Sequence, residues 1–112
     1  MKAWQKKKIV EACEYNARTG GRMIACNYRY SEGIIRCLCP MSALVFQSGD
    51  DVYDLDEEGI AKRAAKILKT NIFNLSAFID GYDGCRRGHI LTGELAKDWN
   101  KFGKEVYRWI FP

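Results

Sequence analysis

The stretch MIACNYRYSEGIIRCLC, residues 23–39, decides the fold class, because its apolar residues follow strand spacing. In its first half every second residue is isoleucine, cysteine or tyrosine, and side chains two positions apart lie on one face of a strand. These alternating residues are Ile24, Cys26, Tyr28 and Tyr30. The segment SEG (31–33) separates this run from IIRCLC (34–39). Two such runs joined by three residues that include glycine predict a β-hairpin.

On both sides of the hairpin the apolar spacing is helical. Residues 4–18 predict a helix that ends at Gly20-Gly21. Pro40 predicts the first turn of a short apolar helix over residues 40–46, because proline is tolerated where backbone N–H groups have no helical partner. The expected buried stripe of the first helix consists of Ile9, Val10, Cys13 and Ala17.

Two further helices are predicted between residues 57 and 83. The acidic segment DDVYDLDEEG (50–59) leads into the first, with Asp54 or Asp56 as its N-cap residue. Asn74 is expected to cap the second. Apolar positions at helical spacing assign the buried faces. They are Ile60, Ala64, Ile67 and Leu68 in the first helix, and Leu75, Phe78, Ile79 and Tyr82 in the second.

A long amphipathic helix is predicted at the C-terminus, from residue 92 to residue 110. Its apolar residues fall within about 100° on a helical wheel. They are Leu95, Trp99, Phe102, Val106, Trp109 and Ile110, and the opposite side carries Lys97, Lys101, Lys104, Glu105 and Arg108. Gly103 lies at the edge of the apolar stripe, where the missing side chain lets a neighbouring backbone approach closely.

These patterns predict an α+β fold: one mostly helical domain over residues 1–112 with a β-hairpin and the long C-terminal helix. The chain has 112 residues, of which 47% are hydrophobic, enough for a core without metals or disulfides. No window approaches the roughly 20 apolar residues that a membrane span needs. The basic N-terminus is not followed by an apolar signal segment. We therefore expect a cytoplasmic protein whose five cysteines are free, largely buried thiols.

The charge is unevenly distributed. Residues 1–40 carry eight basic and three acidic side chains, whereas residues 41–70 carry four basic and six acidic ones. The net charge is +4. Two regions of opposite sign favour charged macromolecular partners over a lipid surface, and they permit nucleic acid as a partner.

The segment NLSAFIDGYDGCRRGH, residues 74–89, holds the candidate chemistry. Ser76, Asp80 and Asp83 share one helix face, and they could form a metal site, an acid pair or a turn bridged to Arg86 and Arg87. A calcium loop needs oxygen ligands at alternate positions, and Tyr82 interrupts that pattern. Gly81 and Gly84 are typical of a helix C-terminus with left-handed residues. A structural turn is the favoured interpretation, followed by a partner-binding loop.

Three functional alternatives depend on other residues. Cys85 and His89 could form a nucleophilic pair beside two arginines. Cys26, Cys37 and Cys39 could bind zinc, but the spacing of one residue lacks the paired pattern of structural zinc sites, and core thiols are favoured. Residues 60–83 could form a DNA-reading helix-turn-helix, although Asp80 and Asp83 on its second helix would repel phosphates.

The motifs CPMSAL (39–44) and FIDGYDG (78–84) resemble a pattern in small uncharacterised proteins of bacteria and their phages. Those proteins carry a Cys-Pro-x-x-Ala-Leu element and later a Phe-Ile-x-Gly-Phe-Asp-Gly element, and this chain has Tyr82 in place of the second phenylalanine. The resemblance implies that the two elements pack together. It implies no catalytic residue, and it makes a phage or mobile-element role conceivable.

The sequence predicts a small non-enzymatic binding protein that acts through charged surfaces on a protein or a protein–nucleic acid complex, such as a host complex modulated by a phage. No catalytic residue, metal or cofactor is expected, since a nucleophile triad, a phosphate-binding glycine loop and zinc spacing are all missing from the sequence. The residues predicted to contact the partner are Asp50, Asp51, Asp54, Asp80, Asp83, Arg86 and Arg87.

Overall fold

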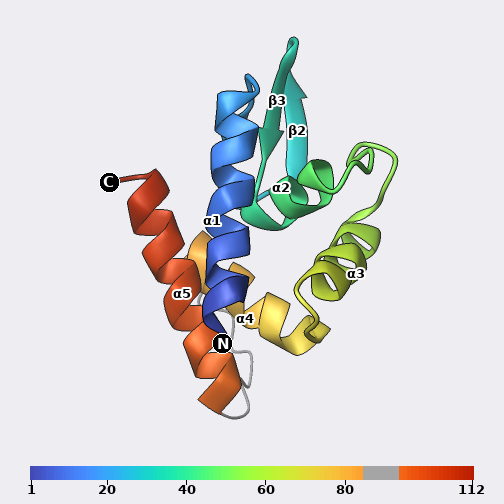
Figure 1. The fold of residues 1–112 in the computed structure, drawn as a ribbon. Helices are drawn as coiled ribbons and strands as arrows, with labels where there is room; N and C mark the ends of the chain where they lie inside the picture. Colours follow the sequence, from blue (N-terminus) through green and yellow to red (C-terminus); the bar gives the residue numbers. More distant parts are fainter. Residues whose placement is uncertain (85–93) are drawn as a thin grey trace.

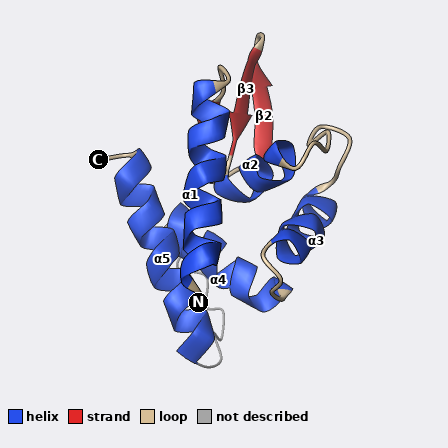
Figure 2. Cartoon of the chain, viewed as in Figure 1, coloured by secondary structure: helices blue, strands red, loops and turns tan. Residues whose placement is uncertain are grey.

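The computed structural model describes residues 1–84 and 94–112, and the α+β fold class is confirmed (Figure 1, Figure 2). Helices dominate, and a small sheet lies beside α1 and α2. In chain order the elements are α1 (Ala3–Arg18), β1 (Arg22–Met23), β2 (Arg29–Glu32), β3 (Ile35–Leu38), α2 (Pro40–Gln47), α3 (Glu57–Ile67), α4 (Ile72–Asp83) and α5 (Glu94–Ile110).

The predicted hairpin is formed by β2 and β3, and β1 adds a third strand. The order is β1-β3-β2, with β1 parallel and β2 antiparallel to β3. The turn comprises Gly33 and Ile34, and Gly33 has a φ of +64°, a conformation that glycine adopts without steric strain.

The predicted strand over residues 24–30 is wrong in its first part. Residues 24–28 leave the strand conformation, and Cys26 has a φ of +65°. The backbone N–H of Cys26 donates to Asp83 Oδ1 at 2.9 Å, so a contact 57 residues away replaces the strand ladder here. Alternating side chains could not reveal that contact.

The buried face of α1 differs from the predicted stripe. Ala17 is exposed and Val10 is half-buried, while Ile9 and Cys13 are buried as predicted. The stripe instead includes two polar side chains, Gln5 and Asn16, which find partners inside the molecule. Gln5 Nε2 donates to the Leu68 carbonyl at 2.7 Å and so joins the start of α1 to the end of α3.

Asn16 joins the end of α1 to the sheet. Its side chain is fully buried, and its Oδ1 accepts a hydrogen bond from Arg36 Nε at 2.8 Å. Its Nδ2 donates to the Arg22 carbonyl at 3.2 Å. The Arg36 guanidinium also lies 3.8 Å from the centre of the Phe46 ring. One buried amide and one arginine therefore connect α1, β1, β3 and α2.

We expect Asn16→Ala to lower the free energy of unfolding by about 2 kcal/mol, because Arg36 and the Arg22 carbonyl lose buried partners. The check is a urea titration of both proteins. Thr19→Ala is a suitable control, since it removes an exposed hydroxyl that also accepts from Arg36. An equal midpoint for Asn16→Ala and the wild type would contradict this role for Asn16.

The predicted helix starts are confirmed for α2 and α3 but not for α4. Pro40 begins α2, and Asp56 caps α3 by accepting from the Gly59 N–H at 2.7 Å. For α4, however, the N-cap residue is Asn71, which accepts from the Asn74 N–H at 2.9 Å. Asn74, the predicted cap, lies in the first turn and is buried. Its amide donates instead to Thr70 Oγ1 at 2.8 Å.

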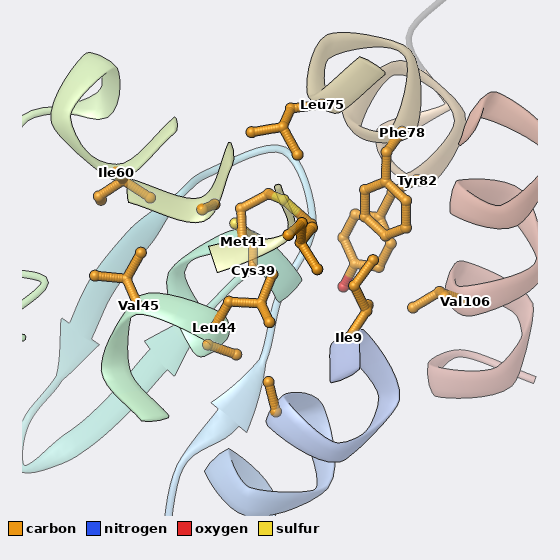
Figure 3. Close-up of a cluster of buried hydrophobic side chains, with 14 of the residues drawn as sticks. Ile9, Cys39, Met41, Leu44, Val45, Ile60, Leu75, Phe78, Tyr82 and Val106 are labelled. Atoms are coloured by element: carbon orange, nitrogen blue, oxygen red, sulfur yellow. The ribbon is translucent and has the colours of Figure 1, made fainter. Parts of the chain in front are cut away.

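All five helices contribute side chains to one core (Figure 3). Ile9 from α1, Leu44 from α2, Ile60 from α3, Phe78 from α4 and Val106 from α5 point toward a common centre. The segment FIDGYDG lies in α4 and its C-cap, and the pattern CPMSAL lies at the start of α2.

The helices α4 and α5 cross with their backbones in contact at two glycines. A methyl group built on Gly103 would lie 2.1 Å from the Phe78 carbonyl oxygen. A methyl group on Gly81 would lie 2.1 Å from the Asn100 carbonyl oxygen. The close approach predicted at Gly103 is confirmed. The prediction that Gly81 lies at the helix end is wrong, because Gly81 lies inside α4. Gly84 takes the left-handed C-cap position.

The apolar stripe of α5 is buried at Trp99, Phe102 and Val106, as predicted. The prediction that Trp109 is buried is wrong, since 49% of its surface is exposed. Trp109 lies at the edge of the stripe on the helical wheel. Across residues 1–84 and 94–112, a helix with the length and apolar character of a membrane span is not found.

Candidate functional site

A pocket of about 330 Å³ opens where α4 faces the starts of α2 and α3 and the segment before β2. Its lining includes three carboxylates, from the exposed Glu57 and the half-buried Asp80 and Asp83, and these three residues are called its rim. Its apolar wall and floor come mainly from α2 and α4. They comprise Pro40, Met41, Phe78, Ile79 and Tyr82, and the remaining lining residues are Cys26, Asn27, Tyr28, Cys39 and Ser76. Figure 3 shows Cys39, Met41, Phe78 and Tyr82 close to one another in this part of the molecule.

The carboxylates come from two helices that are separate in the sequence. Asp80 and Asp83 are three residues apart on α4, a spacing that places side chains on the same helix face. Glu57 is the first residue of α3, where the positive helix end favours an acidic side chain. The pocket therefore brings together an N-terminal residue of one helix and C-terminal residues of the next.

The pKa of Tyr28 depends on burial and on the charges that surround the pocket. Burial is the main cause that raises the pKa of its hydroxyl, to about 12. Cys39, Glu57, Asp83 and Asp80 add to the rise in that order. Ionisation of the Tyr28 hydroxyl is therefore unfavourable beside these carboxylates.

Asp83 has a structural role as well as a place on the rim. Its side-chain Oδ1 accepts from the Cys26 N–H, and its backbone carbonyl accepts from the Cys26 thiol at 3.7 Å. These contacts hold residues 24–28 against the end of α4, with Cys26 in a left-handed conformation that non-glycine residues seldom adopt. The end of α4 thus positions the part of the pocket lining that residues 26–28 form.

Two thiols of the core, Cys13 and Cys39, are kept protonated near neutral pH. Burial raises the pKa of Cys39 to about 11, although hydrogen bonds from Ser42 lower it in part. Burial also raises the pKa of Cys13 strongly. Cys37 is buried as well, so the prediction that most thiols belong to the core is confirmed for these three, while Cys26 is exposed.

Raised thiol pKa values make stability depend on pH. The unfolded thiol titrates near 9.0 and folded Cys39 near 11, so the folded state holds its proton to higher pH. The contribution of the protonated Cys39 thiol to the free energy of unfolding is complete below pH 9, and it is lost as the pH rises to 11. We expect the wild type to lose about 2 kcal/mol more stability than Cys39→Ala between pH 8 and pH 11. Urea titrations at both pH values test this, and parallel losses in the two proteins would contradict it.

Metal binding finds no support in the part of the chain that the structure describes. Three or more histidine, cysteine, aspartate or glutamate side chains are nowhere grouped to hold an ion within residues 1–84 and 94–112. Cys37 and Cys39 are both buried, and the Cys37 thiol lies 3.8 Å from the Ile35 carbonyl.

The acidic loop, residues 50–56, lies apart from the pocket lining and uses several of its carboxylates locally. Asp50 forms an ion pair with Arg63 at 3.0 Å, and Asp51 accepts from the Tyr53 N–H at 2.9 Å. Arg29 donates to the carbonyls of Val52 and Leu55 and fixes the loop to β2. Asp54 is exposed.

The predicted site residues therefore separate into groups. Asp80 and Asp83 lie together on the pocket rim, whereas Asp50, Asp51 and Asp54 do not line it. The other two, Arg86 and Arg87, lie outside the described residues, as do Cys85 and His89 of the alternative nucleophilic pair. Glu57 and Tyr28 were not among the predicted residues, and no sequence signal places either beside Asp80.

The segment 60–83 does form two helices joined by a turn, as a helix-turn-helix would. The exposed side of α4 offers few base-reading groups. Asn74 is buried and bonded to Thr70, while Phe73 is 79% exposed. This geometry does not favour major-groove reading, which uses arginine, lysine, asparagine or glutamine side chains.

The fold and pocket define the chain as a small α+β domain with a carboxylate-rimmed, apolar-floored pocket. Comparison of the chain with protein-family models, with curated proteins and with solved structures finds no match.

Proposed function

We propose that this protein is a small non-enzymatic binding protein that docks a basic segment of a macromolecular partner in the pocket rimmed by Glu57, Asp80 and Asp83. The observation that carries the proposal is the convergence of these three carboxylates, from two helices, on one pocket with an apolar floor. The partner is a protein or the protein part of a protein–nucleic acid complex in the cytoplasm.

The pocket matches the chemistry of lysine and arginine side chains. Each combines an apolar stem with a charged end, and the stem gains by contact with apolar surface while the charge stays in a polar environment. Here Phe78, Ile79 and Tyr82 offer the apolar surface, and Glu57, Asp80 and Asp83 carry the charge opposite to that of lysine and arginine. Arginine fits best, because its planar end can form two parallel hydrogen bonds to a carboxylate.

The protonation state of Cys39, the buried thiol of the pocket, counts against nucleophilic catalysis at that residue. A cysteine nucleophile reacts as the thiolate, and its pKa is lowered in sites that use it. Cys39 has the opposite shift, caused mainly by burial. A role in modulating a host complex rests on the resemblance to phage-encoded proteins, and the pocket geometry is independent of it.

The proposal is tested with a fluorescein-labelled octapeptide of arginine and with a glutamate octapeptide as the control probe. We expect the pocket variant Asp80→Asn/Glu57→Gln to bind the arginine peptide about tenfold more weakly than the wild type. The matched variant Asp54→Asn/Glu58→Gln removes the same charges from exposed positions outside the pocket lining. It should bind within about twofold of the wild type.

Fluorescence anisotropy at two salt concentrations measures these affinities. Equal weakening in both variants would show a general attraction to net charge and would overturn the proposal. Retention of full affinity by the pocket variant would overturn it as well. If a duplex DNA probe bound more tightly than the arginine peptide and its affinity fell steeply with salt, the DNA-reading alternative would replace it.

A further inference from the structure

The outer face of α5 carries a basic stripe, defined as Lys97, Lys101, Lys104 and Arg108. Their spacing of four, three and four residues places them within about 60° of one another on the helix. All four are exposed. Lys101, Lys104 and Arg108 form no ion pair with a carboxylate in residues 1–84 or 94–112. Positive charge on this face is therefore available to a partner.

Two aromatic rings border the stripe at its C-terminal end. Tyr107 is 39% exposed and Phe111 is 38% exposed, and their ring centres lie 4.9 Å apart. Tyr107 packs edge-on against the buried Tyr82 at 5.8 Å, which fixes its position. At helical spacing Tyr107 follows Lys104 by three residues and Phe111 follows Arg108 by three, so each ring is next to a cation.

The opposite border of the stripe is acidic. Asp98 lies on the side of α5 that faces α1, and its carboxylate is 3.6 Å from the amino group of Met1. Glu105 lies on the same side, in a small cleft that Asp98, Lys6 and Phe102 also line and that Lys101 of the stripe borders. In Figure 1 the remaining outer side of α5 is not covered by another helix. A polyanion would therefore lie along the cations on their aromatic side.

The geometry points to a single-stranded nucleic acid as the ligand of this surface, with phosphates on Lys101, Lys104 and Arg108 and an unpaired base on the Tyr107–Phe111 rings. Proteins that bind single strands combine a basic track with aromatic rings on which bases stack. The site is separate from the pocket proposed above to bind a basic segment, and it stands without it.

Two other polyanions fit less well. A duplex keeps its bases stacked inside the helix, so the aromatic rings would have no base to contact. An anionic membrane binds helices that insert an apolar face, and on α5 Trp99, Phe102 and Val106 of that face are buried in the core. Single strands use both the cations and the rings.

The test measures fluorescence anisotropy of a labelled 20-nucleotide oligo(dT) and of oligo(rU) with the whole chain. We expect affinity to fall with salt at a logarithmic slope of about −2, the value for three phosphate contacts on a single strand. Lys104→Gln/Arg108→Gln should bind about tenfold more weakly. Phe111→Ala should also bind about tenfold more weakly, because one stacked base is lost. Thermal melting of each variant verifies that it is folded.

The matched control is Lys7→Gln/Lys62→Gln, which removes two positive charges from α1 and α3, where both lysines form ion pairs with glutamates. It should remain within about twofold of the wild type. Three results would each overturn the inference: equal weakening in the control, undiminished binding by Lys104→Gln/Arg108→Gln, or tighter binding to a 20-base-pair duplex or to phosphatidylserine vesicles than to oligo(dT).

Discussion

Gly103→Ala is expected to lower the free energy of unfolding by about 3 kcal/mol, although alanine normally stabilises a helix by about 1 kcal/mol relative to glycine. The new methyl group would meet the Phe78 carbonyl oxygen at 2.1 Å and the Tyr82 backbone nitrogen at 2.9 Å. These are backbone atoms of α4 and cannot rotate away. The two helices would have to separate, and the packing around Trp99 and Phe102 would loosen.

The check is urea denaturation of Gly103→Ala beside Gly59→Ala. Gly59 also lies in a helix, but the nearest atom to its new methyl group is the Asp56 carboxylate at 2.9 Å, the end of a side chain that can move. The control should stay within about 1 kcal/mol of the wild type. If Gly103→Ala were as stable as the control, the contact between the α4 and α5 backbones would be refuted.

Tyr82→Ala is expected to lower the free energy of unfolding by about 4 kcal/mol, the usual range for removing a buried aromatic ring. Tyr82 is 2% exposed and its ring contacts Phe78, Tyr107 and Phe111. Its hydroxyl donates to the Ile24 carbonyl at 2.7 Å, which joins α4 to the segment after β1.

Tyr82→Phe separates the two contributions of this side chain. It keeps the ring and leaves the Ile24 carbonyl without this donor, so we expect a loss of about 1–2 kcal/mol. Thermal and urea unfolding of both variants give the comparison. Equal losses for Tyr82→Phe and Tyr82→Ala would mean that the ring adds nothing to the core, contrary to its burial.

Elements fixed by local patterns could be predicted from the sequence. The apolar spacing of residues 92–110 predicted the helix that contains α5 and its buried Trp99, Pro40 marked the start of α2, and the predicted choice of Asp54 or Asp56 included the actual cap of α3. Each of these features depends on residues a few positions apart. Helix periodicity and capping are properties of that range.

Features that depend on distant contacts could not be predicted. Cys26 leaves the strand because Asp83 binds its N–H, and Asn16 is buried because Arg36 and Arg22 reach it. The pocket is of this kind too. The sequence marked Asp80 and Asp83 by their spacing, but it gave no reason to place Glu57 beside them, since that proximity comes from the packing of α3 and α4 around α2.

The most direct test of the pocket proposal is a two-dimensional ¹H–¹⁵N NMR titration of the whole chain with the arginine octapeptide. We expect the amide signals around the pocket to shift progressively, with the largest changes at Tyr28, Glu57, Asp80 and Asp83. The amide signals of the acidic loop and of α5 should not shift. Shifts concentrated on residues 50–54, or an unchanged spectrum at saturating peptide, would contradict it.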